Sequence, residues 1–376
     1  MKILQVGKYY PPVKGGMESV LRDLCEGLLA AGHEVNAVVA DVGSEDRIER
    51  LGEHGELVRC GTVGVLASQP LTLSLLHHLR RLIVRDRPDV VQIHVPNPLG
   101  AACLLASRSC LPEGSIITVW HHADVARQRL GRHLVRPLAR ALLNVSDGIC
   151  VSSAALRDGS TELASHRDDV AVIPFGLDPK RWSLKRTDVG EEFVFVGRLV
   201  YYKGLDLLLD AAREVPEMHL TIVGDGPLRS HLLARVANEG LRDRVHLAGE
   251  MTDEQVRRLF SQARALVLPS DHGSETFGVV QLEAMAAGLP VISTTLATGV
   301  AGVNQHEITG LQVPPGDGRA LAGALRRVLD QPESCLRWGR AGRVRVKERF
   351  HRERMIASLL QWYDGLLSDR SKRNSI

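Results

Sequence analysis

The sequence lacks the features that mark secreted or membrane-spanning proteins. Its six cysteines include no Cys-x-x-Cys pair and no histidine neighbour at zinc spacing, which predicts buried thiols in a reducing compartment. The first residues contain too short an apolar run for a signal peptide and no small-residue cleavage site. No stretch approaches the roughly 18 consecutive apolar residues that cross a bilayer. We therefore expect a cytoplasmic protein without a membrane span.

A strong net charge is also missing. The 47 lysines and arginines nearly balance the 44 aspartates and glutamates, and the net charge is only +3. A dedicated nucleic-acid binder has a strong basic excess, so we predict no nucleic-acid partner and expect any cationic site to be local.

The 376 residues, of which 44% are hydrophobic and 24% charged, fit two ordinary globular domains. Short β-branched runs alternate with stretches of helical period, beginning with a strand at 3–6, a helix that ends at Gly32 and a strand at 35–40. This alternation is typical of βαβ units and predicts parallel sheets covered by helices. Further strands are expected at 89–94, 115–120 and 148–151.

The pattern pauses in a segment with proline and glycine at 170–182 and restarts with a strand at 193–196. In this second series we expect, among other elements, a strand at 219–223 and helices at 203–213, 253–262 and 277–287. The sequence thus predicts an α/β fold with two Rossmann-like domains, whose parallel sheets face each other across a cleft.

Two strand ends in the first series have residues that suit a ligand. Gly15 and Gly16 lie in the turn before a long helix, where glycine lets the backbone approach a ligand and helix N–H groups favour anions. A plain strand-to-helix turn explains them equally well. His121, with Asp124 close behind, follows the strand at 115–120, and it either binds substrate or is a satisfied structural side chain.

The second series begins with a strand that ends at Gly197 and is followed by two cations, Arg198 and Lys203. Cations at the carboxyl end of a parallel strand suit a diphosphate, and solvated loop residues are the alternative. Gly224 belongs to the run GDGPLR, which resembles a dinucleotide fingerprint but has Arg229 in place of its third glycine, so NAD binding is weakly supported. Gly224 then either passes close to a ligand or makes a tight turn.

The segment SETFGVVQLEAMAAGLPVIST has two glutamates, Glu275 and Glu283, separated by seven residues. Gly278 and Val279 lie between them, at the expected start of a helix whose first N–H groups can hold a phosphate oxygen, and Glu283 is expected two turns along this helix. Glu275 and Glu283 then accept hydrogen bonds from hydroxyl groups on either side of the phosphate. A nucleoside diphosphate sugar has its groups in this order, with the ribose on one side of the phosphates and the sugar on the other. A helix-face glutamate beside a capping glutamate is the alternative. No Asp-x-Asp pair is present to hold a divalent cation, so we expect no metal and no other cofactor.

Residues 126–140 have arginines at helical spacing, interleaved with apolar side chains and without an acid. Such a helix either lies on an anionic membrane surface or is an ordinary solvated face. The arginines are Arg129, Arg132, Arg136 and Arg140.

The motifs YYPPVKGGMESV, HHADV, VIPFGLDPKRW, VGRLVYYKG, IVGDGPL and SETFGVVQLEAMAAGLPVI, in this order, resemble those of the family 4 glycosyltransferases, which have the GT-B fold. The resemblance covers nearly the whole chain. It implies retaining, metal-independent transfer from a nucleotide sugar. It also implies an acceptor-side domain at 1–175 completed by a crossing helix at about 355–376, and a donor-binding domain at 176–354.

The resemblance also implies a role for each candidate residue. Arg198 and Lys203 would bind the donor diphosphate and stabilise the leaving group, and Glu275 would contact the sugar and Glu283 the ribose. Donor binding would also involve Gly278, Val279, Gly15, Gly16 and Gly224. His121 would contact the transferred sugar.

Within the family, the chain resembles bacterial mannosyltransferases of surface-polysaccharide synthesis, which implies GDP-mannose as donor and a lipid-linked saccharide at the inner face of the cytoplasmic membrane as acceptor. The stretch 296–303 departs from the family pattern, and UDP-glucose or UDP-galactose stays open as donor. A nucleotide-sugar epimerase and a binding-only protein are the other hypotheses.

Overall fold

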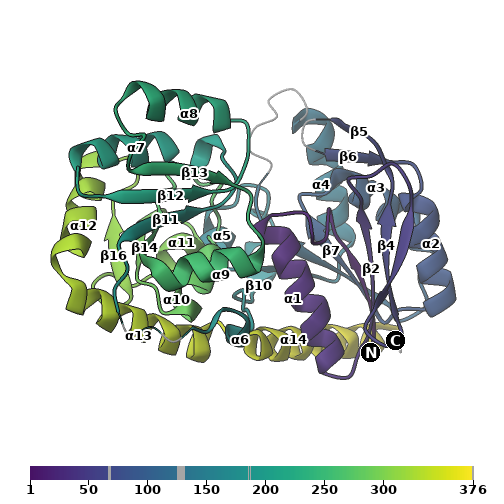
Figure 1. Ribbon diagram of the computed structural model, residues 1–376. Coiled ribbons are helices and arrows are strands. Elements are labelled where there is room, and N and C mark those ends of the chain that lie inside the picture. Colours follow the sequence, from purple (N-terminus) through teal and green to yellow (C-terminus); the bar gives the residue numbers. More distant parts are fainter. Residues whose placement is uncertain (67–68, 125–131, 185, 187, 375–376) are drawn as a thin grey trace. The chain divides into compact units, whose positions relative to one another are not determined.

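The computed structural model describes residues 1–66, 69–124, 132–184, 186 and 188–374, except for the side chains of 132–134 and of 373–374. Internal contacts divide the chain into two compact units. Unit 1 comprises Met1–Phe175 with Arg352–Ile376, and unit 2 comprises Gly176–His351. Figure 1 labels most of their elements.

Unit 1 is built on an eight-stranded sheet in the order β10-β9-β8-β7-β1-β2-β4-β3. All neighbours pair in parallel except β3, which runs antiparallel to β4. The carboxyl ends of the parallel strands therefore meet at one edge of the sheet. The strands are β1 Lys2–Val6, β2 Glu34–Ala40, β3 Arg47–Leu51, β4 Gly55–Cys60, β7 Val90–Val95, β8 Ile116–His121, β9 Gly148–Val151 and β10 Val170–Val172.

The two faces of this sheet are covered differently. One face packs apolar strand residues such as Leu4 and Val6 against helices α2, α3 and α4. Helix α14 packs against α1 and contacts β8, and a Cβ on Gly27 of α1 would lie 2.5 Å from Ile356 of α14, so glycine allows the close approach. The helices are α1 Gly16–Ala30, α2 Leu75–Asp86, α3 Pro98–Ala106, α4 Arg132–Val145, α5 Ala154–Gly159 and α14 Arg352–Asn374.

A separate antiparallel hairpin lies between β4 and α2 in the chain. Its strands are β5 Thr62–Leu66 and β6 Gln69–Thr72. The sequence pattern predicts only parallel strands, so this hairpin and the antiparallel β3 correct that expectation.

Unit 2 has a six-stranded, fully parallel sheet in the order β13-β12-β11-β14-β15-β16. The chain leaves β11 toward β12 and β13 and then returns to the other side of β11 as β14. The order therefore reverses beside the carboxyl ends of β11 and β14, which is where open α/β sheets bind ligands. The strands are β11 Glu192–Val196, β12 His219–Val223, β13 Val245–Gly249, β14 Ala263–Leu268, β15 Val291–Thr294 and β16 Gly310–Val313.

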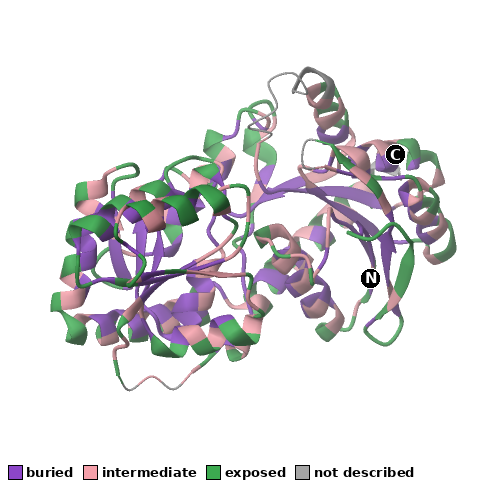
Figure 2. Cartoon of the chain, turned by 45° about the horizontal axis from the view of Figure 1, so that its top comes forward, coloured by how far each residue is buried: buried purple, intermediate pink, exposed green. Residues whose placement is uncertain are grey.

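Helices cover this sheet and bury a core that includes Phe193, Phe195 and Trp338. In Figure 2, strands in both units are mostly purple, which marks buried residues. The helices are α6 Pro179–Trp182, α7 Leu205–Glu214, α8 Arg229–Asn238, α9 Asp253–Gln262, α10 Val280–Ala287, α11 Gly299–Val303, α12 Gly318–Asp330 and α13 Pro332–Arg349.

The parallel α/β architecture confirms the predicted fold class, but two expected helices begin later than predicted. Lys203 ends a 3-10 turn, Tyr201–Lys203, and α7 begins only at Leu205 because Gly204 has the left-handed backbone conformation, with φ 65°. Helix α10 begins at Val280 because Gly278 is also left-handed, with φ 70°. Within the described residues, no helix combines the length and apolar character needed to cross a membrane.

Candidate active site

Lys203 and Glu275 form a buried ion pair in unit 2. Lys203 follows β11 and Glu275 follows β14, and these neighbouring strands end at the same edge of the sheet. The Nζ atom of Lys203 donates to Oε2 of Glu275 at 2.5 Å, and both residues are less than a tenth exposed. Sheet order therefore joins two predicted site residues that lie 72 positions apart.

A second layer of contacts holds Glu275 in place. The Ser270 hydroxyl donates to the same Oε2 atom at 3.2 Å, and the Thr294 hydroxyl donates to the Ser270 carbonyl at 2.6 Å. Thr294 ends β15, the next strand of the sheet. Three strand ends thus contribute to one hydrogen-bonded group, and the Glu275 carboxylate has little freedom to move.

The charge on Lys203 is stabilised despite its burial. Burial alone would lower the pKa of its ammonium, but the Glu275 carboxylate and the Tyr202 hydroxyl outweigh burial and raise that pKa above its ordinary value. The Tyr202 ring also lies 5.7 Å from Nζ. Arg198 is exposed at the end of β11 and acts on Lys203 as a like charge. The site therefore presents two cations, one buried and one exposed.

Glycine is required near this edge because backbones approach closely. A Cβ on Gly224 would lie 2.0 Å from the Gly197 carbonyl oxygen, and Gly224 has φ 128°. This contact between the ends of β11 and β12 explains the glycine without a ligand, so the structure supports the tight-turn alternative. A donor contact at Gly224 stays a prediction.

The N-terminus of α10 begins close behind Glu275. Gly278 has a left-handed backbone, with φ 70°, which favours glycine, and a Cβ here would lie 2.6 Å from a terminal methyl group of Leu268. No side chain caps the helix at Val279, its N-cap residue. Glu283 lies in the first turn of α10 and not two turns along it, which corrects our prediction; it is half-buried.

In unit 1, His121 is the last residue of β8 and is almost fully buried. Its Nε2 atom lies 3.0 Å from Oδ1 of Asp124. Asp124 also accepts hydrogen bonds from the Ser160 hydroxyl at 2.5 Å and from the Thr161 backbone N–H at 2.8 Å. Burial works to raise the pKa of Asp124, but the hydrogen bonds from His121 and Ser160 outweigh it and lower the pKa. A fixed, ionised carboxylate therefore orients the His121 ring.

Gly15 and Gly16 occupy the turn after β1, at the same sheet edge as His121. Gly15 is the N-cap of α1 and Gly16 its first residue, and no side chain caps this helix start. The Gly15 backbone is extended, so its conformation does not require glycine. The structure leaves both readings of this turn open.

One group of described residues, His121, Asp124 and Glu162, has ligand atoms within 4.8 Å of one another and is a geometric candidate for a metal ion. Asp124 already accepts from His121, Ser160 and Thr161 through both carboxylate oxygens. A cation would have to displace these donors, so the chemistry of the group does not fit a metal.

The structure describes only some of the four arginines that the sequence analysis singled out in residues 126–140. Arg129 lies outside the described residues, and Arg132 is described only as the first residue of α4. Arg136 is half-buried and Arg140 is exposed on the same helix.

Sequence reasoning missed several supporting residues. Ser270 and Thr294 hold Glu275, and Ser160 and Thr161 hold Asp124. Hydroxyl residues are common at strand ends, and no spacing links these to their partners; only the position of Ser270 after a buried strand could have indicated it.

Two family models match consecutive parts of the chain. The model described as Glycosyltransferase Family 4 matches residues 14–181, and the one described as Glycosyl transferases group 1 matches residues 178–345. The second match contains Lys203 and Glu275.

Curated relatives match over nearly the full length. The O-antigen chain mannosyltransferase C of Escherichia coli is 32% identical, with 99% of this chain and 100% of the relative covered. The D-rhamnosyltransferase WbpZ of Pseudomonas aeruginosa is 33% identical, with 93% and 92% covered.

Solved structures share the fold. Sucrose-phosphate synthase from Thermosynechococcus elongatus is 23% identical with a TM-score of 0.82, over 98% of this chain and 99% of that one. Anabaena HepE in complex with UDP is 17% identical with a TM-score of 0.74, over 97% and 100%. Both likenesses show the GT-B fold. Together with the family models and the full-length relatives, they show that the chain belongs to glycosyltransferase family 4 and is a glycosyltransferase.

Proposed function

We propose that this enzyme transfers mannose from GDP-mannose to a lipid-linked saccharide at the inner face of the cytoplasmic membrane, in the synthesis of O-antigen or a related polysaccharide. The curated relative named as an O-antigen mannosyltransferase supports this choice of pathway and hexose. The relative named as a D-rhamnosyltransferase supports sugar transfer but a different sugar. The transfer proceeds with retention of configuration and without a metal ion.

The buried Lys203–Glu275 pair is the observation that carries the proposal. Its position beside the reversal of strand order in unit 2 is where a nucleotide binds in open α/β sheets. Lys203 and Arg198 bind the donor diphosphate and offset the negative charge that develops as the leaving group departs. Backbone N–H groups of Gly278 and Val279 add donors at the start of α10.

The remaining residues are assigned to the transferred sugar and to the ribose of the donor. Both described bonds to the Glu275 carboxylate use Oε2, so we assign Oε1 to a hydroxyl of the transferred sugar. Glu283 accepts from the ribose. His121, oriented by Asp124, contacts the transferred hexose. We assign no protein nucleophile: the acceptor attacks the face that the leaving group vacates, and the donor phosphate takes the acceptor proton.

The test is a panel of labelled GDP-mannose, UDP-glucose and UDP-galactose, incubated with polyprenyl-linked saccharides in the presence of EDTA. We expect label to pass from GDP-mannose to the lipid fraction, with an α linkage in the product by NMR because the donor is an α-glycoside. Transfer only from a UDP sugar would assign the alternative donor.

Two outcomes contradict other parts of the proposal. Activity that disappears with EDTA and returns with Mn²⁺ would overturn metal-independent transfer. Conversion of the nucleotide sugar to its epimer without an acceptor would indicate an epimerase, and donor binding with no turnover would indicate the binding-only alternative.

A further inference from the structure

A group of exposed apolar side chains in unit 1 has no role in the donor site. Within the described residues, large exposed apolar side chains concentrate between positions 42 and 84. Leu73 is 83% exposed and Leu66 is 68% exposed. We use the name apolar hairpin for the exposed residues of β5, β6 and the position that follows: Val63, Val65, Leu66, Leu71 and Leu73.

The sequence of this segment is unusual for a solvated hairpin. Residues 61–76 contain no aspartate, glutamate, lysine, arginine or histidine. Exposed hairpins ordinarily have charged or polar residues on their solvent faces, and contiguous exposed apolar side chains mark an interaction surface. The apolar hairpin therefore needs a partner that accepts aliphatic side chains.

The helix that follows has the opposite character. Residues 77–87 contain four arginines, two histidines and a single acid, Asp86. A groove joins the two segments and is lined by Leu73, Leu76, His77, Arg80, Arg81 and Val84. Aliphatic and cationic side chains thus share one surface.

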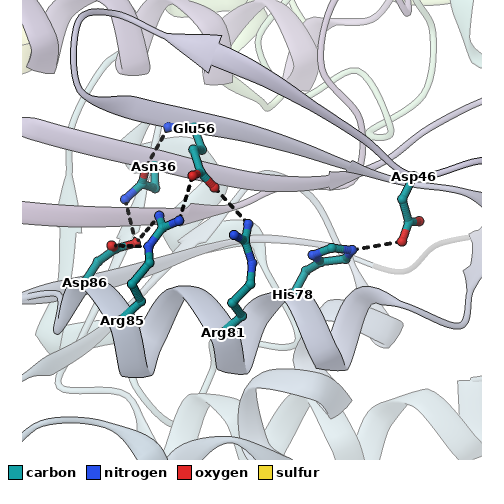
Figure 3. Close-up of polar contacts among 7 residues, drawn as sticks. All are labelled: Asn36, Asp46, Glu56, His78, Arg81, Arg85 and Asp86. Atoms are coloured by element: carbon teal, nitrogen blue, oxygen red, sulfur yellow. Dashed lines mark hydrogen bonds and ion pairs between the residues drawn. The ribbon is translucent and has the colours of Figure 1, made fainter.

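The acids near α2 already have basic side chains as partners, as Figure 3 shows. Glu56 of β4 pairs with Arg81 at 2.8 Å and Arg85 at 2.6 Å, and Asp46 pairs with His78 at 2.8 Å. Asp86 pairs with Arg85 at 2.6 Å.

Two arginines of the same segment stay uncompensated. Arg80 donates to the backbone carbonyl of Ala106 and not to an acid. Arg87, at the C-terminal end of α2, is exposed, and within the described residues neither arginine forms an ion pair. The solvent side of α2 therefore keeps two uncompensated positive charges: Arg80, which lines the groove together with Leu73, and Arg87, at the end of α2 that is farther from the apolar hairpin.

The position of the hairpin relates it to the acceptor side of the site. Strand β4 ends at Cys60, and β4 runs parallel to β2 and, through β1 and β7, parallel to β8. The hairpin therefore leaves the sheet at the edge where β8 ends in His121.

We propose that the apolar hairpin and the basic face of α2 form the surface by which this enzyme docks on an anionic lipid bilayer. The apolar side chains enter the interfacial layer, and Arg80 and Arg87 pair with anionic headgroups; stable peripheral binding requires two such signals together. A second copy of the chain fits less well, because a symmetric dimer would place the same cations against each other. The inference rests on the proposed function in one respect, that the acceptor is lipid-linked.

The test compares sedimentation of the full-length protein with vesicles of phosphatidylcholine, with and without phosphatidylglycerol. The triple variant Val63→Ser, Val65→Ser and Leu66→Ser should lower partitioning into anionic vesicles by about tenfold or more, since aliphatic burial drives insertion. All three side chains are exposed, so the fold should tolerate serine.

Two further variants complete the design. Arg80→Gln with Arg87→Gln should lower binding only to anionic vesicles, and the difference should disappear at high salt. The matched control replaces exposed apolar residues of unit 2, Leu233→Ser, Ile308→Ser and Val344→Ser, and should bind like the wild type.

Unchanged partitioning of the hairpin variant would overturn the proposal, as would equal wild-type binding to neutral and anionic vesicles. A wild-type dimer that the hairpin variant converts to a monomer in sedimentation velocity would also overturn it, because a second copy would then cover the hairpin. Transfer to a water-soluble acceptor analogue separates the two proposals. The hairpin variant should retain transfer to this soluble analogue. A wild type that binds vesicles but transfers no hexose would contradict the proposed function and leave the docking proposal intact.

Discussion

At the scale of single residues, the donor site depends on charges that stabilise one another. Lys203 keeps its charge in a buried position because Glu275 lies 2.5 Å away, and Glu275 tolerates burial because Lys203 and Ser270 donate to it. Removing one member of a buried pair leaves the other charge uncompensated. Variants here therefore have to separate catalysis from folding.

Replacing Lys203 by alanine should lower kcat/KM roughly 30- to 900-fold, because the transition state loses one charge-stabilising donor. This corresponds to an increase of about 2 to 4 kcal/mol in the activation free energy. Steady-state kinetics with the preferred donor would measure the loss. The double variant Lys203→Met with Glu275→Gln removes both charges and should unfold at a urea concentration closer to the wild type than the single variant does. Near-normal turnover of Lys203→Ala would exclude the leaving-group role.

Replacing Asp124 by asparagine should lower kcat by up to about 100-fold while the donor KM stays nearly constant, because the His121 ring loses the ionised partner that orients it. The matched control is Thr161→Val, which removes only the hydroxyl bond to Asp124 and keeps the backbone bond. If Asp124→Asn changes the urea midpoint but neither kinetic constant, Asp124 has a structural role only.

At the scale of elements, glycines decide where the chain can turn beside the site. Gly204 separates the turn that positions Lys203 from helix α7, and a Cβ at this position would lie 2.0 Å from the Pro269 carbonyl oxygen. Gly240 offers a comparison, because its φ of 69° is similar and its Cβ would meet no atom within 4 Å.

Gly240→Ala should cost about 1 kcal/mol of unfolding free energy for the left-handed strain alone, and Gly204→Ala about 1 to 3 kcal/mol more for the steric overlap. Urea unfolding of both variants would measure the difference. Equal costs would mean that the loop after β14 can move away from α7 without loss.

Sequence signals within single elements also explain which helices and strands are predicted correctly. The expected ranges 148–151, 219–223 and 253–262 agree with β9, β12 and α9 in every residue, because β-branched runs and a capping box at Thr252 are local signals. Strands β3, β4, β10 and β16 and the hairpin β5–β6 are missing from the prediction. In β3, charged residues interrupt the continuous apolar pattern that is typical of a buried parallel strand.

At the scale of the whole molecule, buried histidines make unit 1 sensitive to acid. His94 of β7 and His122 lie 2.9 Å apart between ring nitrogens, and the other His94 nitrogen lies 2.9 Å from Gln5. Burial lowers the pKa of His94 to about 3. Burial, together with His94 and His121, places the pKa of His122 well below its ordinary value.

Both histidines are neutral in the folded chain and become protonated near pH 6.5 when it unfolds. The unfolded state then binds more protons, so stability should fall as the pH drops below 6.5, by up to about 1.4 kcal/mol per pH unit for each histidine. Urea unfolding between pH 7 and 4.5 would measure the slope. His94→Gln should be less stable at pH 7 but show a shallower slope, and an unchanged slope would contradict this account.

The sequence by itself determined the two βαβ series, the family and the positions of its motifs, because periodicity and glycine signals act between close neighbours in the chain. Only the tertiary structure decided that Lys203 meets Glu275, that Asp124 meets Ser160, and that α14 packs against α1. These contacts join residues far apart in sequence, and they depend on the order of strands in each sheet and on the packing of helices against it.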